Sequence, residues 1–231
     1  MGAVRSPGGR PLARERGQPG PVPSDAMSGR QYFDADPAVG SRPTTVTLGP
    51  PDGPVELLAD RGVFSITRVD AGTAALLRSV PVPPPDGEVL DLGCGYGPIA
   101  VALARRNPQT TVWALDVNRR AVDLTAANAA RLGLVNVRAV TPEDVPDGME
   151  FAEVWSNPPV RIGKPALREL LERWLARLAP AGRALLVAHR HLGADSLAAW
   201  LEESDRDGDG PWAVRRVASK SGYRVLELRR Q

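Results

Sequence analysis

Short apolar runs alternate with segments of helical periodicity along the chain from residue 88 to residue 228. The runs have the length and residue types of buried strands, whereas the segments repeat apolar residues three and four positions apart. Regular alternation of strand and helix predicts an α/β fold, with a mostly parallel sheet that carries helices on both faces. The strands are expected at residues 89–92, 111–115, 136–140, 151–156, 184–188, 213–217 and 224–228, and the helices at residues 98–103, 119–132, 165–178 and 194–203.

The segment 165–178 shows the strongest helical pattern in the chain. Its apolar positions are Leu167, Leu170, Leu171, Trp174, Leu175 and Leu178. These positions share one face of a helix, and Pro165 suits the first helical turn. Pro180 and Gly182 are then expected to break the helix before the next strand begins. Further along, residues 219–222 predict a hairpin turn between the last two strands.

The region before the central strands has a different pattern. Residues 44–47 and 55–58 alternate, or nearly so, on either side of a turn rich in Gly and Pro, which predicts a β-hairpin. Residues 61–65 predict a further turn and a short strand. Asp70 is placed to cap a helix that continues through Leu77.

Composition divides the chain into units at residues 1–27, 28–84 and 85–231. The first is rich in Gly, Pro and Arg and nearly free of apolar residues, so it is expected to be a disordered basic tail. It has no apolar segment of the kind found in a signal peptide, and Met27 opens a different kind of sequence, so we expect an extension upstream of the folded part. The second unit is the lead-in hairpin and helix, packed on the third, which is the core.

Length, composition and net charge limit the class of protein. The chain has 231 residues, of which 42% are hydrophobic and 24% are charged, as in a soluble globular protein. No apolar run is long enough to cross a membrane. The single cysteine excludes an internal disulfide and suits a reducing, cytoplasmic compartment. The net charge of +2 comes from the tail, where four arginines stand against Glu15 and Asp25. Bulk charge therefore gives no support to nucleic-acid binding, which would need a local basic patch or the tail itself.

A glycine-rich turn follows the first strand of the core. Gly93, Gly95 and Gly97 stand between this strand and a helix that begins at Pro98. Such an order forms a site for a nucleotide-type cofactor, because glycines let the backbone approach a ligand and a helix start offers free N–H groups. Pro98 occupies the place of the third glycine of the dinucleotide fingerprint, which disfavours a nicotinamide oxidoreductase. The alternative is a purely structural turn. In either case Cys94 is expected to be a small filler and not a nucleophile.

Two acidic residues follow the next strands. Asp116 ends the second strand of the core, where a carboxylate can accept hydrogen bonds from both hydroxyls of a ribose. Val117 would then pack on one face of an adenine. Asp144 follows the third strand and in this fold would reach the exocyclic amine of adenine. Asp116 is also placed to cap the helix 119–132, a role compatible with ribose binding.

Asn157, Pro158 and Pro159 directly follow the fourth strand. Two prolines enforce an extended turn and supply no N–H donors, which leaves carbonyl acceptors beside the side-chain oxygen of Asn157. Such acceptors can hold an NH₂ group by its two hydrogens and aim its nitrogen at a methyl donor. They also bind better as that nitrogen gains positive charge. This chemistry needs no metal. The alternative is a plain turn that ends the strand.

Two motifs resemble those of a known family. Asp91-Leu-Gly-Cys-Gly-Tyr-Gly97 looks like the first motif of the class I S-adenosylmethionine (SAM) methyltransferases. Together with Ser156-Asn-Pro-Pro159, it resembles the "methyltransferase small" domain, and within that group the ribosomal RNA small-subunit methyltransferase C type. Tyr32-Phe33, residues 62–65 and residues 70–73 match the same type. The resemblance covers roughly the whole chain after the tail.

The resemblance implies a fold, a cofactor and a substrate. The fold is a Rossmann-like seven-stranded sheet whose final strand is antiparallel. The cofactor is SAM, the methyl acceptor is guanine N2 of small-subunit ribosomal RNA, and the partner is that RNA or the small ribosomal subunit. We expect a monomer without metal or membrane. The implied catalytic residues are Asn157, Pro158 and Pro159. The implied cofactor-binding residues are Asp91, Gly93, Cys94, Gly95, Gly97, Asp116, Val117, Asp144 and Asn157.

Val160 departs from the family pattern, which carries Phe or Tyr after the second proline to stack on the target base. Stacking on a ring contributes about 1–3 kcal/mol per base, so another ring, Phe33 or Phe64, is needed to replace it. The expected substrate-binding residues are Phe33, Phe64, Val160, Arg161, Lys164 and His191, of which the last three are basic and suited to phosphate contacts.

Two other functions remain open. One keeps the enzyme class and changes the acceptor to a glutamine amide of a protein or a small amine, which the near-zero charge of residues 27–231 favours. The other is a module that retains SAM without turnover and binds RNA or the ribosome, which Val160 favours.

Overall fold

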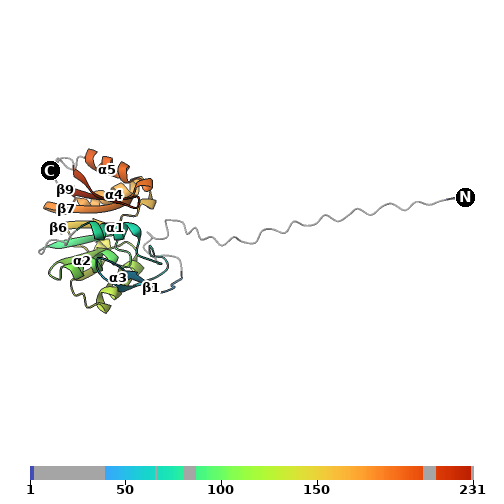
Figure 1. The fold of residues 1–231 in the computed structure, drawn as a ribbon, viewed down its shortest axis with the longest axis horizontal. Coiled ribbons are helices and arrows are strands. Elements are labelled where there is room, and N and C mark those ends of the chain that lie inside the picture. The colour runs from blue at the N-terminus through green and yellow to red at the C-terminus, as the bar shows by residue number, and fades with distance from the viewer. Residues whose placement is uncertain (3–39, 66, 81–86, 205–211, 230–231) are drawn as a thin grey trace.

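The computed structural model describes residues 1–2, 40–65, 67–80, 87–204 and 212–229 (Figure 1). The predictions for Phe33 and for most of the tail 1–27 lie outside these residues. Within the described part, the chain forms a two-stranded hairpin and a seven-stranded sheet with five α-helices.

The main sheet has the strand order β5-β4-β3-β6-β7-β9-β8. The strands are β3 Glu88–Leu92, β4 Thr111–Leu115, β5 Val137–Val140, β6 Phe151–Ser156, β7 Leu178–His189, β8 Ala213–Lys220 and β9 Tyr223–Arg229. Strands β3 to β7 are parallel, and β9 is antiparallel to both of its neighbours. The predicted Rossmann-like sheet with an antiparallel final strand is therefore confirmed. Strand order reverses between β3 and β6, and ligands of such sheets bind at the carboxyl ends beside that point.

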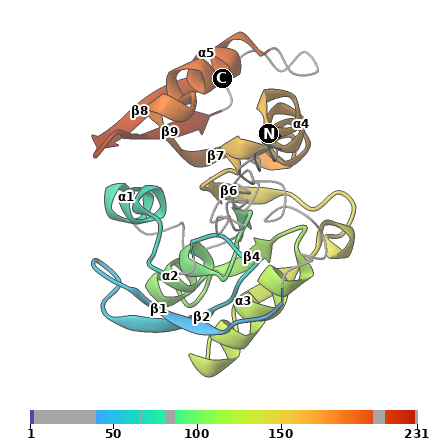
Figure 2. The ribbon, with the colours of Figure 1, turned by 90° about the vertical axis from the view of Figure 1, so that its right-hand side faces the viewer.

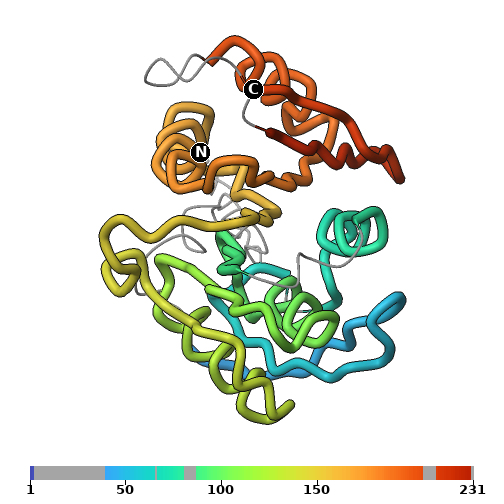
Figure 3. The backbone as a smooth tube through the Cα atoms, turned by 90° about the vertical axis from the view of Figure 1, so that its left-hand side faces the viewer, coloured from blue at the N-terminus to red at the C-terminus, as the bar shows by residue number. Residues whose placement is uncertain are grey.

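Helices cover both faces of the sheet (Figures 2 and 3). The helices of one face are α1 Ala71–Ser79, α2 Pro98–Arg106 and α3 Arg119–Arg131, and those of the other are α4 Lys164–Leu175 and α5 Ala194–Glu203. Successive strand residues point to opposite faces. Val89 accordingly packs in the core beneath α1 and α2, while Leu90 and Leu92 pack in the core beneath α4 and α5. The strands read as continuous apolar runs because both of their faces are buried.

The lead-in hairpin, β1 Thr44–Leu48 and β2 Val55–Ala59, is antiparallel, as predicted. Polar contacts from α3 and α2 attach it to the core. Asn128 on α3 accepts from the Leu58 backbone N–H at 2.7 Å and donates to the Leu58 carbonyl at 2.9 Å. Arg106 on α2 pairs with Asp52 in the hairpin turn at 2.6 Å, with both side chains largely buried. The hairpin is thereby held against α2 and α3, next to the glycine-rich turn.

Residues 61–65 form turns and bends, so the predicted short strand there is wrong. The cause is the buried Asp60, whose carboxylate accepts from the Arg61 N–H at 2.7 Å, while its carbonyl accepts from the Val63 N–H at 3.2 Å. Asn118 at the start of α3 then donates to the Gly62 carbonyl at 2.8 Å. These bonds draw the loop over the carboxyl end of β3 and β4.

The predicted end of the helix 165–178 is also wrong. Helix α4 ends at Leu175, and Leu178 begins β7 by pairing with Phe151. Pro180 and Gly182 lie within this strand, where the pairing register shifts. Leu178 keeps its apolar spacing because it is fully buried among the core residues beneath α4, although it now lies in a strand. The other predicted elements are confirmed, with ends that differ by a few residues.

Candidate active site

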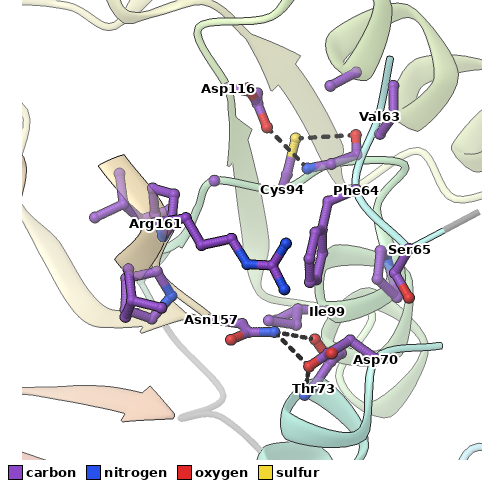
Figure 4. A pocket seen from close by; sticks show the side chains of 18 of the residues that line it. Val63, Phe64, Ser65, Asp70, Thr73, Cys94, Ile99, Asp116, Asn157 and Arg161 are labelled. Atoms are coloured by element: carbon purple, nitrogen blue, oxygen red, sulfur yellow. Dashed lines mark hydrogen bonds between the residues drawn. The ribbon is translucent and has the colours of Figure 1, made fainter. Parts of the chain in front are cut away.

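A cavity of about 290 Å³ opens at the carboxyl ends of β3, β4, β6 and β7 (Figure 4). The glycine-rich turn after β3 and the Asn-Pro-Pro turn after β6 form parts of its wall, as does the loop 63–65 from the lead-in. Two motifs that are far apart in the sequence therefore share one cavity. The position agrees with the switch point of the sheet.

The backbone of the glycine turn is fixed to the end of β4. The N–H groups of Gly93 and Cys94 donate to the Leu115 carbonyl at 2.8 and 2.9 Å. Gly93, Gly95 and Gly97 all have positive φ, between 60° and 90°, a conformation that costs other residues about 1–2 kcal/mol. A Cβ atom on Gly93 would meet no atom within 4 Å, so this stretch of backbone borders open space. The turn can therefore lie directly against a ligand.

Asp91 and Gly97 do not line the cavity but support the turn from behind. Asp91 is fully buried and accepts from the Ala100 N–H at 2.9 Å, while its second oxygen has no partner among the described residues. Burial raises the pKa of Asp91 to about 8, with a smaller contribution from the nearby Asp116. Because Pro98 has no N–H and Ala100 is already bonded, the start of α2 offers fewer free donors than the sequence suggests.

Asp116 lies on the cavity wall at the end of β4. Its two oxygens accept from the N–H groups of Gly95 and Asn118, each at 3.0 Å. Burial raises the pKa of this carboxyl, and the backbone hydrogen bonds oppose that effect. Val117 beside it is 38% exposed and also lines the cavity. A carboxylate with an apolar neighbour fits the ribose and base of a nucleoside. Asn118, rather than Asp116, caps α3 by accepting from the Arg120 N–H.

Asp144 lies outside the cavity lining. Its carboxylate accepts from both the N–H and the hydroxyl of Thr141, at 3.1 and 2.7 Å, in a local capping box. These bonds lower the pKa of Asp144 and hold the side chain on its own turn.

The Asn-Pro-Pro turn presents a defined set of acceptors. The Asn157 amide nitrogen donates to Asp70 Oδ1 at 2.8 Å and to Thr73 Oγ1 at 3.1 Å (Figure 4). With both amide hydrogens directed to the lead-in helix, the oxygen of Asn157 is left as its acceptor. The Pro158 carbonyl accepts from the Val160 N–H at 2.8 Å, so one of its two lone pairs is used. The turn therefore keeps at least two acceptor positions without any N–H donor from its prolines.

Only one of the three basic residues expected on the rim lines the cavity. Arg161 lines the cavity, as do Phe64 and Val160. Lys164 and His191 do not. Lys164 is exposed and donates to Ser196 at 3.4 Å, and His191 accepts from its neighbour Arg190 at 3.1 Å.

Several cavity residues were not predicted. His189 ends β7 and packs edge-on against Tyr223, with ring centroids 4.8 Å apart, and both line the cavity. Tyr96 within the glycine turn is 2% exposed, and its hydroxyl has no hydrogen-bond partner among the described residues. Burial raises the pKa of Tyr96, and the Asp70 carboxylate adds to this effect. The position of His189 at a strand end was the available signal.

Two other features are absent from the described residues. No group of His, Cys, Asp or Glu that could hold a metal ion is found among them. None of their helices is both long enough and apolar enough to cross a membrane.

Comparison with known proteins identifies the family. Residues 54–227 match the model of the methyltransferase small domain. An uncharacterized Bacillus subtilis protein, YbxB, is 32% identical over 86% of this chain and 98% of its own length. The ribosomal RNA small subunit methyltransferase C of Pseudomonas aeruginosa is 34% identical over 85% of this chain, which spans 57% of that relative.

A solved structure has the same fold. It is a 16S rRNA N2 methyltransferase of Thermus thermophilus, in complex with AdoMet and guanosine, with a TM-score of 0.66 and 22% identity. The match covers 84% of this chain and 52% of that one. The match of the family model to three quarters of the chain, at the residues that form the cavity, decides the assignment. This chain belongs to the methyltransferase small domain family.

Proposed function

We propose that this protein is a SAM-dependent N-methyltransferase that acts on an exocyclic amine, and that the acceptor is guanine N2 in small-subunit ribosomal RNA. The observation that carries the proposal is the orientation of Asn157. Its amide nitrogen is bonded to Asp70 and Thr73, so its oxygen is the group left for an amine donor in the cavity.

The cavity residues that follow β3 and β4 fit the cofactor. Gly93 offers a backbone surface without a side chain, and its Cβ position borders open space. Asp116 keeps lone pairs beyond those used by Gly95 and Asn118, and these suit the two hydroxyls of a ribose. Val117 offers an apolar contact for a purine face. We place Asp91, Cys94 and Gly97 in this site as support for the turn, and Asp144 is assigned no contact in it.

The cavity residues that follow β6 fit the methyl acceptor. When bound, SAM supplies a methyl group on a positively charged sulfonium sulfur. The Asn157 oxygen and the Pro158 carbonyl each accept one hydrogen of the target amine, and Pro159 keeps the turn rigid. This arrangement fixes the direction of the nitrogen lone pair, a contribution of position rather than of acid–base chemistry. As the nitrogen becomes positive, the same acceptors bind it more strongly, which favours the transition state.

The substrate class rests on the relatives. The P. aeruginosa relative is named as a methyltransferase of small-subunit ribosomal RNA, and the T. thermophilus structure contains a guanosine. The cavity residues of this chain include one aromatic ring near the mouth, Phe64, and one permanently charged cation, Arg161. Both groups suit a nucleotide better than an aliphatic amide.

The test begins with calorimetric titration of SAM into the purified protein. Binding is expected, and its absence would overturn the proposed activity. Transfer of a tritiated methyl group is then measured on naked ribosomal RNA, on small ribosomal subunits and on ribosomal proteins. Label in the RNA that is recovered as N2-methylguanosine supports the proposal, whereas label only in protein assigns the acceptor to a glutamine amide.

A further inference from the structure

Arg161 and Phe64 face each other across the mouth of the cavity. Phe64 comes from the lead-in loop and Arg161 from the turn after β6, and both line the cavity. Figure 4 shows the Arg161 side chain reaching towards the Phe64 ring, with Asn157 beneath them in that view. Phe64 is 41% exposed, so part of this large apolar side chain is uncovered at the cavity. The two groups thus bound a gap above the proposed amine-binding acceptors.

The local fold explains why Arg161, not Val160, projects into this gap. Residues 160–162 form a single 3₁₀ turn, closed by a hydrogen bond from the Ile162 N–H to the Pro159 carbonyl at 3.0 Å. Val160 and Ile162 pack against the core cluster that contains α4. Arg161, between them, is exposed. Val160 therefore packs against the core and also lines the cavity. Arg161 carries the side chain that extends across the mouth of the cavity.

The charge of Arg161 is not offset by the protein. The guanidinium makes no hydrogen bond or ion pair with any residue in the described part of the chain. The two carboxylates that line the cavity are bonded elsewhere, Asp70 to α1 and Asn157, and Asp116 to backbone N–H groups. The target nitrogen becomes positive during methyl transfer, and a guanidinium that cannot lose its proton would repel it, so an electrostatic role of Arg161 in catalysis is disfavoured. A stacking role is suitable, because a guanidinium is a weakly hydrated plane that stacks well on π-systems.

We propose that the guanidinium plane of Arg161 replaces the missing aromatic ring, and that the target base is held between it and Phe64. The inference rests on the proposed function and makes it more specific. Its acceptor is an unpaired nucleobase, since only a base removed from its stack presents two faces to such a clamp. A glutamine side chain has no extended π-face and would leave the gap unfilled. Arg161 is thus a positioning residue for the base, while Asn157 holds its amine.

The test uses a short single-stranded oligoribonucleotide with one central 2-aminopurine, which carries an amino group on C2 as guanine does and loses fluorescence on stacking. The matched oligonucleotide has an abasic site in its place. Binding is measured with S-adenosylhomocysteine present, for the wild type and for Arg161→Lys, which keeps the charge and removes the plane. Arg190→Lys is the control, because Arg190 is exposed on the same rim outside the cavity lining.

Arg161→Lys is expected to weaken binding of the 2-aminopurine oligonucleotide about 5- to 150-fold, the range of one lost stacking contact. Binding of the abasic oligonucleotide is expected to stay unchanged, and Arg190→Lys is expected to change neither.

Three outcomes overturn the inference. Equal losses on both oligonucleotides make Arg161 a phosphate contact, and weaker SAM binding makes it a cofactor contact. Unchanged binding of the 2-aminopurine oligonucleotide excludes any role in base capture. Failure of the proposed function is distinct from all three, because it appears as a wild type that does not bind SAM.

Discussion

The amide nitrogen of Asn157 lies 2.8 Å from Asp70 Oδ1, although the two residues are 87 positions apart. The same oxygen accepts from the N–H groups of Gly72 and Thr73, at 2.8 and 3.3 Å, and so caps helix α1. One carboxylate oxygen therefore joins the first turn of the lead-in helix to the end of β6. The lead-in is more than a cover for the sheet, because it decides which end of the Asn157 amide meets the cavity.

Asn157→Asp tests this orientation. The new carboxylate would lose both donated hydrogen bonds and would face the Asp70 carboxylate, so the side chain is expected to rotate away. Methyl transfer to the proposed acceptor, guanine N2 of small-subunit ribosomal RNA, should fall about 10²- to 10³-fold, as when one preorganised active-site hydrogen-bonding group is removed. SAM affinity should be retained.

Thr73→Val is the matched variant for that experiment. It removes the weaker of the two acceptors, at 3.1 Å, and leaves Asp70 in place. Its kcat should fall less than that of Asn157→Asp. Wild-type turnover by Asn157→Asp would show that the amide orientation has no part in catalysis.

Asp116→Asn is expected to weaken SAM binding. Hydrogen bonds to a charged group contribute about 1.5–3 kcal/mol, which corresponds to roughly a 10- to 150-fold loss of affinity by calorimetry. Asp123→Asn on the exposed face of α3 changes the same charge outside the cavity and serves as the control. Equal affinity of the two variants would remove Asp116 from the cofactor site.

Gly97→Ala is expected to destabilise the protein more than Gly133→Ala. Both glycines have positive φ, 90° and 67°, so both substitutions cost about 1–2 kcal/mol from conformation alone. A Cβ on Gly97 would also lie 2.9 Å from the Thr125 side chain, whereas one on Gly133 would meet nothing within 4 Å. Overpacking of this kind adds about 1–3 kcal/mol.

Urea unfolding measures the difference between these two glycine variants. Thr125→Ala in the Gly97→Ala background should recover part of the additional loss, because it removes the group that the new Cβ meets. Similar free energies of unfolding for Gly97→Ala and Gly133→Ala would contradict the contact.

The stability of the fold should fall as the pH rises from about 5 to 8. In the folded protein Asp91 keeps its proton up to a pKa of about 8, while its ordinary value is 3.8, so folding takes up a proton between these values. Proton uptake on folding lowers the free energy of unfolding as the pH increases, and the effect levels off above the folded pKa. The raised pKa of Asp116 acts in the same direction.

Asp91→Asn removes the contribution of Asp91 and leaves that of Asp116. Urea unfolding between pH 5 and pH 9 should therefore show a shallower pH dependence for this variant than for the wild type. A slope equal to that of the wild type would show that Asp91 is already ionised in the folded protein.

Local chemistry determined most of the fold. Apolar runs and helical spacing placed the strands and helices, because each pattern reports which faces of an element are buried. The glycine turn and the Asp70 cap were equally local, since positive φ and a capping carboxylate depend on a few adjacent residues. The mostly parallel sheet followed from the alternation, and its antiparallel final strand from the resemblance to the family, whereas the order of the strands is known from the structure alone.

Local chemistry failed where a distant partner outweighed it. Leu178 fits the apolar spacing of the helix, but its side chain is buried equally well in a strand. Its pairing with Phe151 places it in the strand β7. Asp144 is a different case, because its partner is local. Its sequence position placed it near the cavity, whereas Thr141, only three residues earlier, holds its carboxylate on its own turn.

The sequence by itself determined which residue types lie at strand ends, and hence the kind of site. Only the tertiary structure decided which of them share the cavity: His189 instead of His191, and Arg161 instead of Lys164. It also supplied the partner, Asp70, that holds the Asn157 nitrogen and leaves its oxygen as the acceptor. The physical reason is that side-chain direction and hydrogen-bond partner depend on groups such as Asp70, which the fold brings close although the chain keeps them far apart.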